Sequence, residues 1–264
     1  MPQFRHGKNT RIFVDGYELS RSLKNVTTQQ QMDTGETTGF TSTQKSYVAG
    51  IPEMSVNADG MFAFDSVTLD NIDNVLQAVM AVETPIAISV AFDNGVTAGK
   101  LVKAGQALET DINVNSSITD IVATTAAFKV TDAFFSGISL RDPDSVLALT
   151  GVASSGVGQD MTAFATHITP SIQMKNGGIA VLHVIANTVN STTTLKFQHS
   201  TLIGGTYVDF ATFTIPANTK AGYTFVVPAG ALDKFIKYNI TATGTGNLQF
   251  LAVFAPRTAS IQVA

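Results

Sequence analysis

Residues 11–19 read Arg11-Ile-Phe-Val-Asp-Gly-Tyr-Glu-Leu19, in which two apolar runs flank an Asp-Gly pair. Asp-Gly readily takes the positive φ angles of a tight two-residue turn, so the stretch predicts a β-hairpin with strands at 11–14 and 17–19. The rest of the chain has short apolar runs, abundant Thr, Ser, Ala, Val and Gly, and few helical stretches. This composition predicts a mainly β protein in which helix is the minority.

Two segments after the hairpin, 26–32 and 54–62, alternate between larger and polar side chains. Because side chains alternate across a strand, each segment predicts a strand with one strongly polar face. A register slip of one residue would reverse the two faces. The polar positions are Thr27, Gln29 and Gln31 in the first segment and Ser55, Asn57 and Asp59 in the second.

Between these strands, the stretch from Thr34 to Tyr47 is rich in Thr, Ser, Gly and Gln and has hardly any large apolar residue. It cannot bury a core of its own, so we expect it to project as a long loop or arm that needs a neighbour to hold it.

One helix and one strand complete the first half of the chain. Asp70 to Val82 predicts a helix, with Asp70 or Thr68 placed to cap it. We expect the helix to cover one open side of the β core. Its apolar stripe is formed by Ile72, Val75, Leu76 and Val79. In the strand at 86–92, large side chains alternate with small ones that can face a packed neighbour.

The composition changes sharply at 151–160, where small, polar and flexible residues follow one another. We therefore expect a first domain at 1–150, a flexible linker at 151–165 and a second domain at 166–264. Short strands at even spacing in the second domain predict an antiparallel β-sandwich, Ig-like or jelly-roll-like. They lie at 179–186, 194–199, 207–215, 223–227, 234–243 and 248–254.

Composition and charge exclude several classes of protein. The chain has no Cys, so it holds neither a disulfide framework nor a thiolate metal site. A formal charge of -4 gives no basic surface for gripping nucleic acid. The polar start lacks a secretory signal and no apolar run is long enough to span a bilayer, so we expect a soluble chain made in the cytoplasm. Charged residues are only 14%, which indicates that much of the surface faces other protein.

No arrangement of residues predicts catalysis, a metal site or a cofactor. None of the four histidines has a paired ligand spacing, and His183 falls within an apolar strand, where a hydrogen-bonded structural role is the favoured interpretation. Asp142-Pro143-Asp144 is typical of a turn, and the carboxylates at 70–73 are typical of a helix cap. We therefore expect a protein that is not an enzyme.

The order Ile12-Phe-Val-Asp-Gly-Tyr-Glu-Leu19, Asp33-Thr-Gly-Glu-Thr-Thr38, Lys45-Ser-Tyr-Val-Ala-Gly-Ile51 and Ser55-Val-Asn-Ala-Asp-Gly-Met-Phe62 resembles the major tail tube proteins of long-tailed, siphovirus-like bacteriophages. The resemblance covers roughly residues 8 to 141. It implies an N-terminal tail-tube-like β-sandwich or barrel with a flanking helix and a projecting loop. The C-terminal sandwich looks like the extra domains that many such proteins carry on their outer surface.

The resemblance also implies a function. Members of this family are virion proteins whose six-fold rings stack into a tail tube, through which DNA passes without specific binding. Implied partners are copies of the chain and the tape measure, tail terminator and tail-tip proteins. The six polar positions named above become candidates for the lumen. The inter-subunit arm would use Thr34, Glu36, Thr37, Thr38, Phe40, Lys45 and Tyr47.

Two other functions fit the sequence. A capsid decoration or cement protein would also be β-rich, free of cysteine and low in charge, although the long Thr-rich arm favours the tube. A glycan-binding module displayed by the C-terminal domain would use aromatic residues as a sugar-stacking platform, but these fall inside predicted strands, where core packing is the default. They are Phe197, Phe210, Phe213, Phe225, Phe235 and Phe250.

Overall fold

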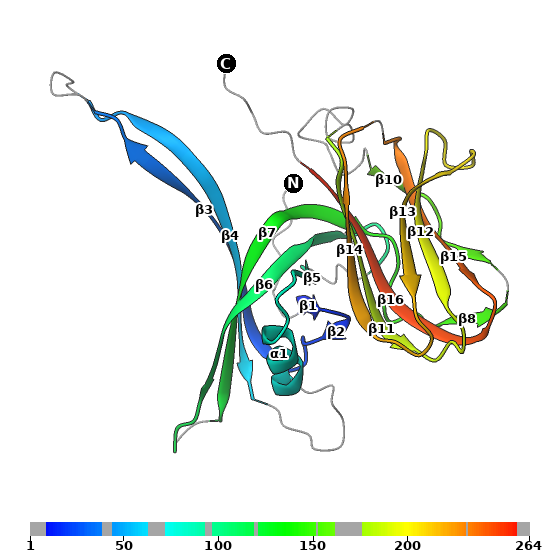
Figure 1. The fold of residues 1–264 in the computed structure, drawn as a ribbon, viewed down its shortest axis with the longest axis horizontal. Coiled ribbons are helices and arrows are strands. Elements are labelled where there is room, and N and C mark those ends of the chain that lie inside the picture. Colours follow the sequence, from blue (N-terminus) through cyan, green and yellow to red (C-terminus); the bar gives the residue numbers. More distant parts are fainter. Residues whose placement is uncertain are drawn as a thin grey trace.

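The computed structural model describes residues 9–38, 44–62, 72–92, 97–118, 121–151, 153–161, 176–230 and 232–257. Within them the chain is mainly β with one helix, as predicted (Figure 1). The elements are β1 Arg11–Val14, β2 Tyr17–Glu18, β3 Leu23–Glu36, β4 Tyr47–Met61, α1 Ile72–Met80, β5 Ile86–Ala91, β6 Leu101–Asn115, β7 Ala123–Ser139, β8 Leu147–Thr150, β9 Ser154–Ser155, β10 Gln159–Asp160, β11 Gly178–Asn187, β12 Thr193–Ser200, β13 Val208–Ile215, β14 Ala221–Val227, β15 Phe235–Ala242 and β16 Thr245–Pro256.

The first hairpin forms where the sequence predicts it. Val14 pairs with Tyr17 across a two-residue turn. Asp15 and Gly16 occupy the turn with φ angles of 44° and 83°, the positive values that an Asp-Gly turn supplies. The hairpin extends a sheet in which β1 pairs with β5 and β5 pairs with β6.

The first half of the chain builds the strand order β3-β4-β7-β6-β5-β1-β2, and α1 covers one face of it (Figure 1). The predicted apolar stripe of α1 is confirmed, because Ile72, Val75, Leu76 and Val79 are all buried in one core cluster with strand residues such as Val56 and Phe128. The predicted cap at Thr68 or Asp70 lies outside the described residues.

The second half of the chain forms the sandwich that the strand spacing predicts. The strands β14, β11 and β16 face the second sheet, β10-β15-β12-β13, across a shared core. Phe197, Phe213 and Phe250 lie buried in that core, as core packing predicts. Phe210 and Phe235 are half-buried, and Phe225 is 38% exposed. Because β16 also pairs with β7, one 11-stranded sheet runs through both halves of the chain.

The segment 151–165, which composition predicts to be a flexible linker, contains two short paired strands. Both β9 and β10 pair with β15, and the backbone N–H of Met161 donates to the carbonyl of Lys234 at 3.0 Å. Small polar side chains do not prevent backbone pairing where a strand edge is within reach, so 154–160 belongs to the second sheet. The division of the chain into domains at this segment stays a prediction.

A third apolar layer joins the two halves. Small side chains of β5, Ala87 and Ala91, and the ring of Phe13 pack against Ile179 and Val181 of β11. The prediction that the small face of this strand meets a packed neighbour is therefore confirmed.

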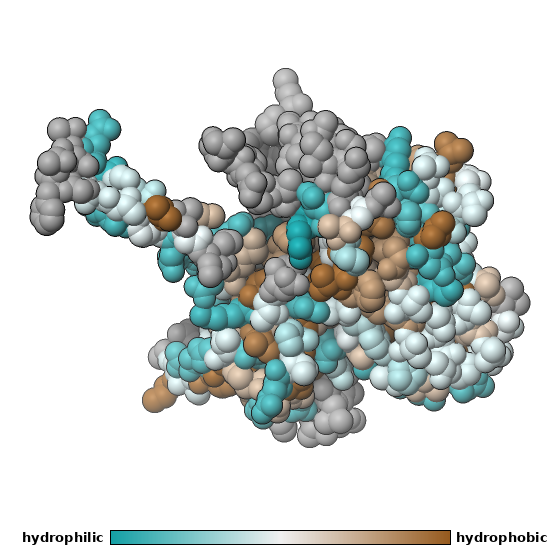
Figure 2. Space-filling model, turned by 45° about the horizontal axis from the view of Figure 1, so that its top comes forward, coloured by the Kyte–Doolittle hydropathy of each residue, from teal (hydrophilic) through white to brown (hydrophobic). Residues whose placement is uncertain are grey.

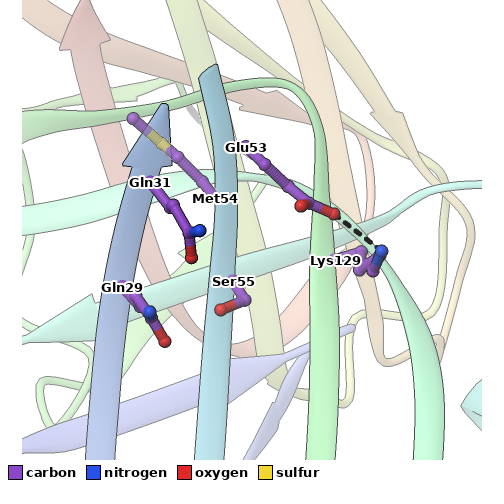
Figure 3. Close-up of a pocket in the computed structure, with 6 residues that line it drawn as sticks. All are labelled: Gln29, Gln31, Glu53, Met54, Ser55 and Lys129. Atoms are coloured by element: carbon purple, nitrogen blue, oxygen red, sulfur yellow. Dashed lines mark hydrogen bonds and ion pairs between the residues drawn. The ribbon is translucent and has the colours of Figure 1, made fainter. Parts of the chain in front are cut away.

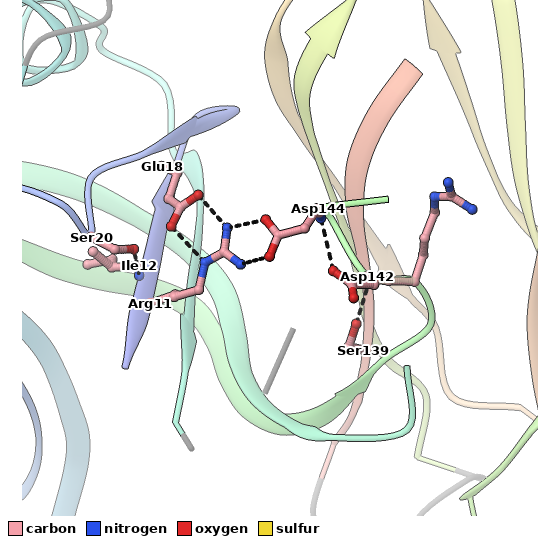
Figure 4. Close-up of polar contacts among 8 residues, drawn as sticks. Arg11, Ile12, Glu18, Ser20, Ser139, Asp142 and Asp144 are labelled. Carbon is pink, nitrogen blue, oxygen red and sulfur yellow. Dashed lines mark hydrogen bonds and ion pairs between the residues drawn. The ribbon is translucent and has the colours of Figure 1, made fainter. Parts of the chain in front are cut away.

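Two polar contacts lie at the same boundary between the two halves of the chain. The imidazole of His183 accepts a hydrogen bond from the Gly16 N–H at Nδ1 (3.3 Å), so Nε2 carries the proton and donates to Ser89 Oγ at 2.9 Å. Arg11 lies between Glu18 and Asp144, with its Nε 2.6 Å from Glu18 and its two terminal nitrogens 2.7 and 2.9 Å from Asp144 (Figure 4). Asp144 sits in the predicted turn, where its N–H donates to the Asp142 carboxylate at 2.9 Å.

Candidate assembly surface

Four strands, β3, β4, β7 and β6, carry a continuous polar face on the side opposite α1. Cross-strand pairing places Thr27 opposite Asn57 and Gln29 opposite Ser55. The six positions named from alternation therefore share one face, and all are exposed or half-buried. The strand register extends this face over β7 and β6, for which no polar face was predicted. The added residues are Thr125, Ala127, Lys129, Asp111 and Asn113.

The same strands bury their other face. Val56 lies between Ser55 and Asn57 in sequence and points the opposite way, into the core under α1, where Phe128 and Ala126 of β7 join it. No element of the described chain covers the polar side of the strands in the same manner. The sheet is thus amphipathic, with one face packed by its own helix and the other face open.

A shallow depression of about 170 Å³ lies on this face and is lined by Gln29, Gln31, Glu53, Met54, Ser55 and Lys129 (Figure 3). The Lys129 ammonium contacts the Glu53 carboxylate at 2.6 Å, and this hydrogen bond raises the pKa of Lys129. Glu53, Asp59 and Asp111 share the face with Lys129, so negative groups outnumber positive ones there. The described residues hold no group of three or more potential metal ligands.

Neutralising Glu53 tests whether the excess of carboxylates on the polar face weakens DNA binding. In Glu53→Gln the Lys129 ammonium loses its partner, so we expect a severalfold gain in affinity for double-stranded DNA at low salt that disappears by about 0.3 M salt. Ser55→Ala, a neighbouring change without a charge, is the control. Fluorescence anisotropy with a labelled DNA duplex measures the affinity of each variant. Equal affinities would contradict the interpretation that Glu53 neutralises the charge of Lys129.

The polar sheet has two edges without a strand partner in the described chain. β3 pairs only with β4, so its outer edge is open along its length. β5 pairs with β6 only from Val102 to Ala107, which leaves the β6 edge open from Leu108 to Asn115. Long open edges are templates for pairing with another chain.

Beyond the body, β3 and β4 continue as a two-stranded arm that stands away from the rest of the molecule (Figures 1 and 2). The sequence predicts a loop or arm here. In the structure β3 runs to Glu36 and β4 begins at Tyr47, because the Thr-rich chain pairs across the two strands of the arm. Three large apolar side chains are exposed on it, Met32 (51%), Tyr47 (55%) and Val48 (58%).

The predicted arm residues lie together near the end of this ribbon. Lys45 contacts Glu36 at 3.1 Å, Thr37 Oγ1 lies 2.8 Å from Ser46 Oγ, and the Ser46 N–H donates to Thr38 Oγ1 at 3.0 Å. Thr34 and Tyr47 are exposed within the strands, and Phe40 lies outside the described residues. These contacts hold the ribbon together but attach it to nothing else.

These features define the class of protein. It is a mainly β protein whose amphipathic sheet has an uncovered polar face, two open edges and a projecting two-stranded arm. No known family model matches the sequence, and no curated protein matches it. No helix within the described ranges has the length and apolar character needed to cross a membrane.

Several solved structures are similar in fold. A chain of the virion of a native gene transfer agent particle is 15% identical, with a TM-score of 0.40 over 50% of this chain and 97% of its own. The SPP1 Dit (gp 19.1) protein, described as a hub of the adsorption apparatus in Gram-positive infecting phages, is 8% identical, with a TM-score of 0.38 over 94% of this chain and 99% of its own. A chain of the sheath-tube complex of the extracellular contractile injection system PVC is 12% identical, with a TM-score of 0.37 over 48% of this chain and 86% of its own. At these identities the likeness is one of fold alone.

Proposed function

We propose that the chain is a structural subunit of a phage tail tube, and that copies join into six-fold rings through the open edges of the polar sheet. The observation that carries the proposal is the amphipathic four-stranded sheet. Within the described residues it is packed by α1 on one face, polar and uncovered on the other, and unpaired along β3 and along the 108–115 part of β6.

Strand directions support edge-to-edge closure. In the order β3-β4-β7-β6 each neighbouring pair is antiparallel, so β3 and β6 run in opposite directions. A copy placed beside the first therefore brings its β3 antiparallel to the open part of β6. Repeating this step around an axis closes a barrel and pairs both open edges of the polar sheet, which protects them against uncontrolled pairing.

The polar face would then line the lumen. Its uncharged amides and hydroxyls, together with an excess of carboxylates, offer DNA few cationic contacts, so the genome could pass without being retained. The tape measure, tail terminator and tail-tip proteins are the further partners of this proposal. The arm would pack on a neighbouring subunit or on the next ring, where its exposed Tyr47 and Val48 would become buried.

Assembly of the purified chain tests the proposal. We expect sedimentation and negative-stain microscopy at high concentration to show rings with a central hole and stacks of rings. A chain that stays monomeric at high concentration would contradict the proposal, and so would monomers or trimers that bind capsids, as expected of a cement protein. Rings that never stack would support the six-fold ring but contradict the proposal that the rings form a tube.

Cross-linking tests which edges meet. The chain has no cysteine, so Thr27→Cys on β3 and Asn113→Cys on β6 can be joined specifically by a flexible bis-maleimide. We expect a ladder of linked species on a denaturing gel that ends at six copies. Thr27→Cys combined with Thr212→Cys, an exposed position on the outer sheet of the sandwich, is the matched control and should give no ladder.

A further inference from the structure

The open edge of β6 is shorter than the strand that would pair with it. Within the described residues β5 pairs with β6 as far as Ala107, so the edge is open only over 108–115. β3 has 14 residues. In the antiparallel pairing proposed above, the start of the neighbour's β3 lies toward Asn115 and its later residues lie toward Leu108. Part of β3 must therefore extend past the end of the open edge.

The register within the sheet indicates which part of β3 this is. Cross-strand pairing continues from Thr27 through β4 and β7 to Asp111, so these two residues lie at one level across the four strands. The copies in a closed ring lie at one height. A neighbour at the same level therefore brings about residues 23–30 of its β3 beside 108–115 of the receiving copy.

β5 of the receiving copy then forces the neighbour's strand out of the sheet. Gln31 would come next along β3, but the place beside Ala107 is already taken by Ile86 of β5. The pairing of β3 with β4 has a register shift just beyond this point, between Met32 and Thr34. Such an irregularity bends a pair of strands. The bend of the arm thus coincides with the position at which β5 blocks a straight path.

Met32 lies on the α1 side of the two strands. It pairs with Pro52, which precedes Val56 on β4 by an even number of residues. Val56 is buried in the core under α1, and side chains an even number of residues apart share one face of a strand. Sheets that are joined edge to edge have continuous faces. The neighbour's Met32 therefore lies on the same side as α1 of the receiving copy.

The segment between α1 and β5 is the surface that lies there. The Val82 N–H donates to a carbonyl of the last helical turn at 3.0 Å, and Ile86 begins β5 beside the end of the open edge. Residues 80–85 are all exposed, with Met80 38% and Val82 41% exposed. At about 3.3 Å per residue, Val82 lies at most about 13 Å from Ile86. This distance places it next to the point where the neighbour's strand leaves the sheet.

We propose that Met80 and Val82 of each copy receive Met32 of the neighbouring copy in the same ring, so that the base of the arm docks on the C-terminal end of α1. The inference rests on the proposed function, because it uses the same pairing of β3 with β6. Met32 is 51% exposed in the free chain. Contact removes these three apolar side chains from water, and this burial favours closure of the ring. The occupant of the surface is thus a copy in the same ring rather than one in the next ring.

Single cysteines test the contact directly, because the chain has none of its own. A chain carrying only Met32→Cys is assembled with an equal amount of a chain carrying only Val82→Cys and is treated with a short bis-maleimide. On a denaturing gel we expect a covalent dimer from the mixture, in single rings as well as in stacks, and none from either chain alone. Met32→Cys mixed with Val114→Cys is the matched control and should give no dimer, since Val114 is 47% exposed but lies near the far end of the open edge.

A charge placed in the contact should weaken assembly. In Val82→Asp we expect the critical concentration for rings, measured by sedimentation, to rise at least about tenfold, because the contact would desolvate a carboxylate against Met32. Val157→Asp is the control, at a 74% exposed position in the second half of the chain, and should assemble as the unaltered chain does. Both positions are exposed, so the melting temperature should stay unchanged in both variants.

The outcomes distinguish failure of the inference from failure of the proposed function. The inference is wrong and the ring stands if Thr27→Cys/Asn113→Cys gives its ladder but Met32→Cys and Val82→Cys give no dimer, or give one only in stacked rings. Assembly of Val82→Asp at the concentration of the unaltered chain would also contradict the inference. If no ring forms and neither pair of cysteines is joined, the proposed function itself fails and the inference falls with it.

Discussion

Acidification from pH 7 to pH 3.5 is expected to lower the free energy of unfolding by about 4 kcal/mol through His183 alone. Complete burial between the two halves of the chain lowers the pKa of His183 to about 3. The unfolded chain, with an ordinary histidine pKa of about 6.5, binds the proton first as pH falls. Stability from the neutral imidazole is therefore full above pH 6.5 and is lost progressively down to about pH 3.

Protonation also breaks a specific contact, because Nδ1 accepts the Gly16 N–H and cannot do so once it carries a proton. The effect is measured by denaturant unfolding at a series of pH values for the unaltered chain and for His183→Gln. Glu109 acts in the opposite direction, since a raised carboxyl pKa adds stability as pH falls from about 8 to 4.5. Only the difference between the two proteins therefore isolates His183.

His199→Gln is the control for this measurement. His199 is partly buried and contacts Asp233 at 3.0 Å in the second sheet, away from the seam between the halves. We expect His199→Gln to keep the acid-dependent loss and His183→Gln to flatten it. If the free energy of unfolding depended on pH with the same slope in all three proteins, His183 would already take up its proton in the folded chain.

Removal of the arm is expected to abolish assembly while leaving the subunit folded. Thr34 pairs with Ala49, so Gly35–Val48 can be replaced by Asn-Gly, which closes the shortened hairpin with a tight turn. The described residues of the deleted segment, 35–38 and 44–48, are exposed or half-buried and belong to none of the buried clusters, so the melting temperature should change little. The critical concentration for rings or stacks should rise at least about thirtyfold, since an interface aromatic such as Tyr47 commonly contributes about 2 kcal/mol.

A second variant, which removes exposed apolar side chains outside the arm, controls for the effect of lost apolar surface on solubility. Leu202→Ser/Ile203→Ser removes side chains that are 66% and 59% exposed in the β12–β13 loop. We expect this variant to assemble as the unaltered chain does. If the armless variant forms rings and stacks at the same concentration as the control, the arm has no role between subunits.

Local patterns in the sequence determined much of the first half of the chain. The Asp15-Gly16 turn, the apolar stripe of α1 and the alternation in β3 and β4 each follow from neighbouring residues, and the structure confirms all three as local features. The same reasoning could not place Lys129 or Asp111 on the polar face, because their positions depend on pairing between strands far apart in the chain. Alternation within β6 and β7 was the only available signal, and two register shifts in the β6–β7 pairing interrupt it.

Local sequence patterns therefore predict a β-rich chain with one helix, a polar face on two strands and a Thr-rich projection, because turn chemistry and side-chain period act over a few residues. Contacts between distant strands establish that one sheet continues through both halves, that β9 and β10 pair with β15, and that Glu109 is buried beside an open edge. Backbone pairing and desolvation depend on which distant strands meet. Neither can be recognised from the residues that neighbour a position in the sequence.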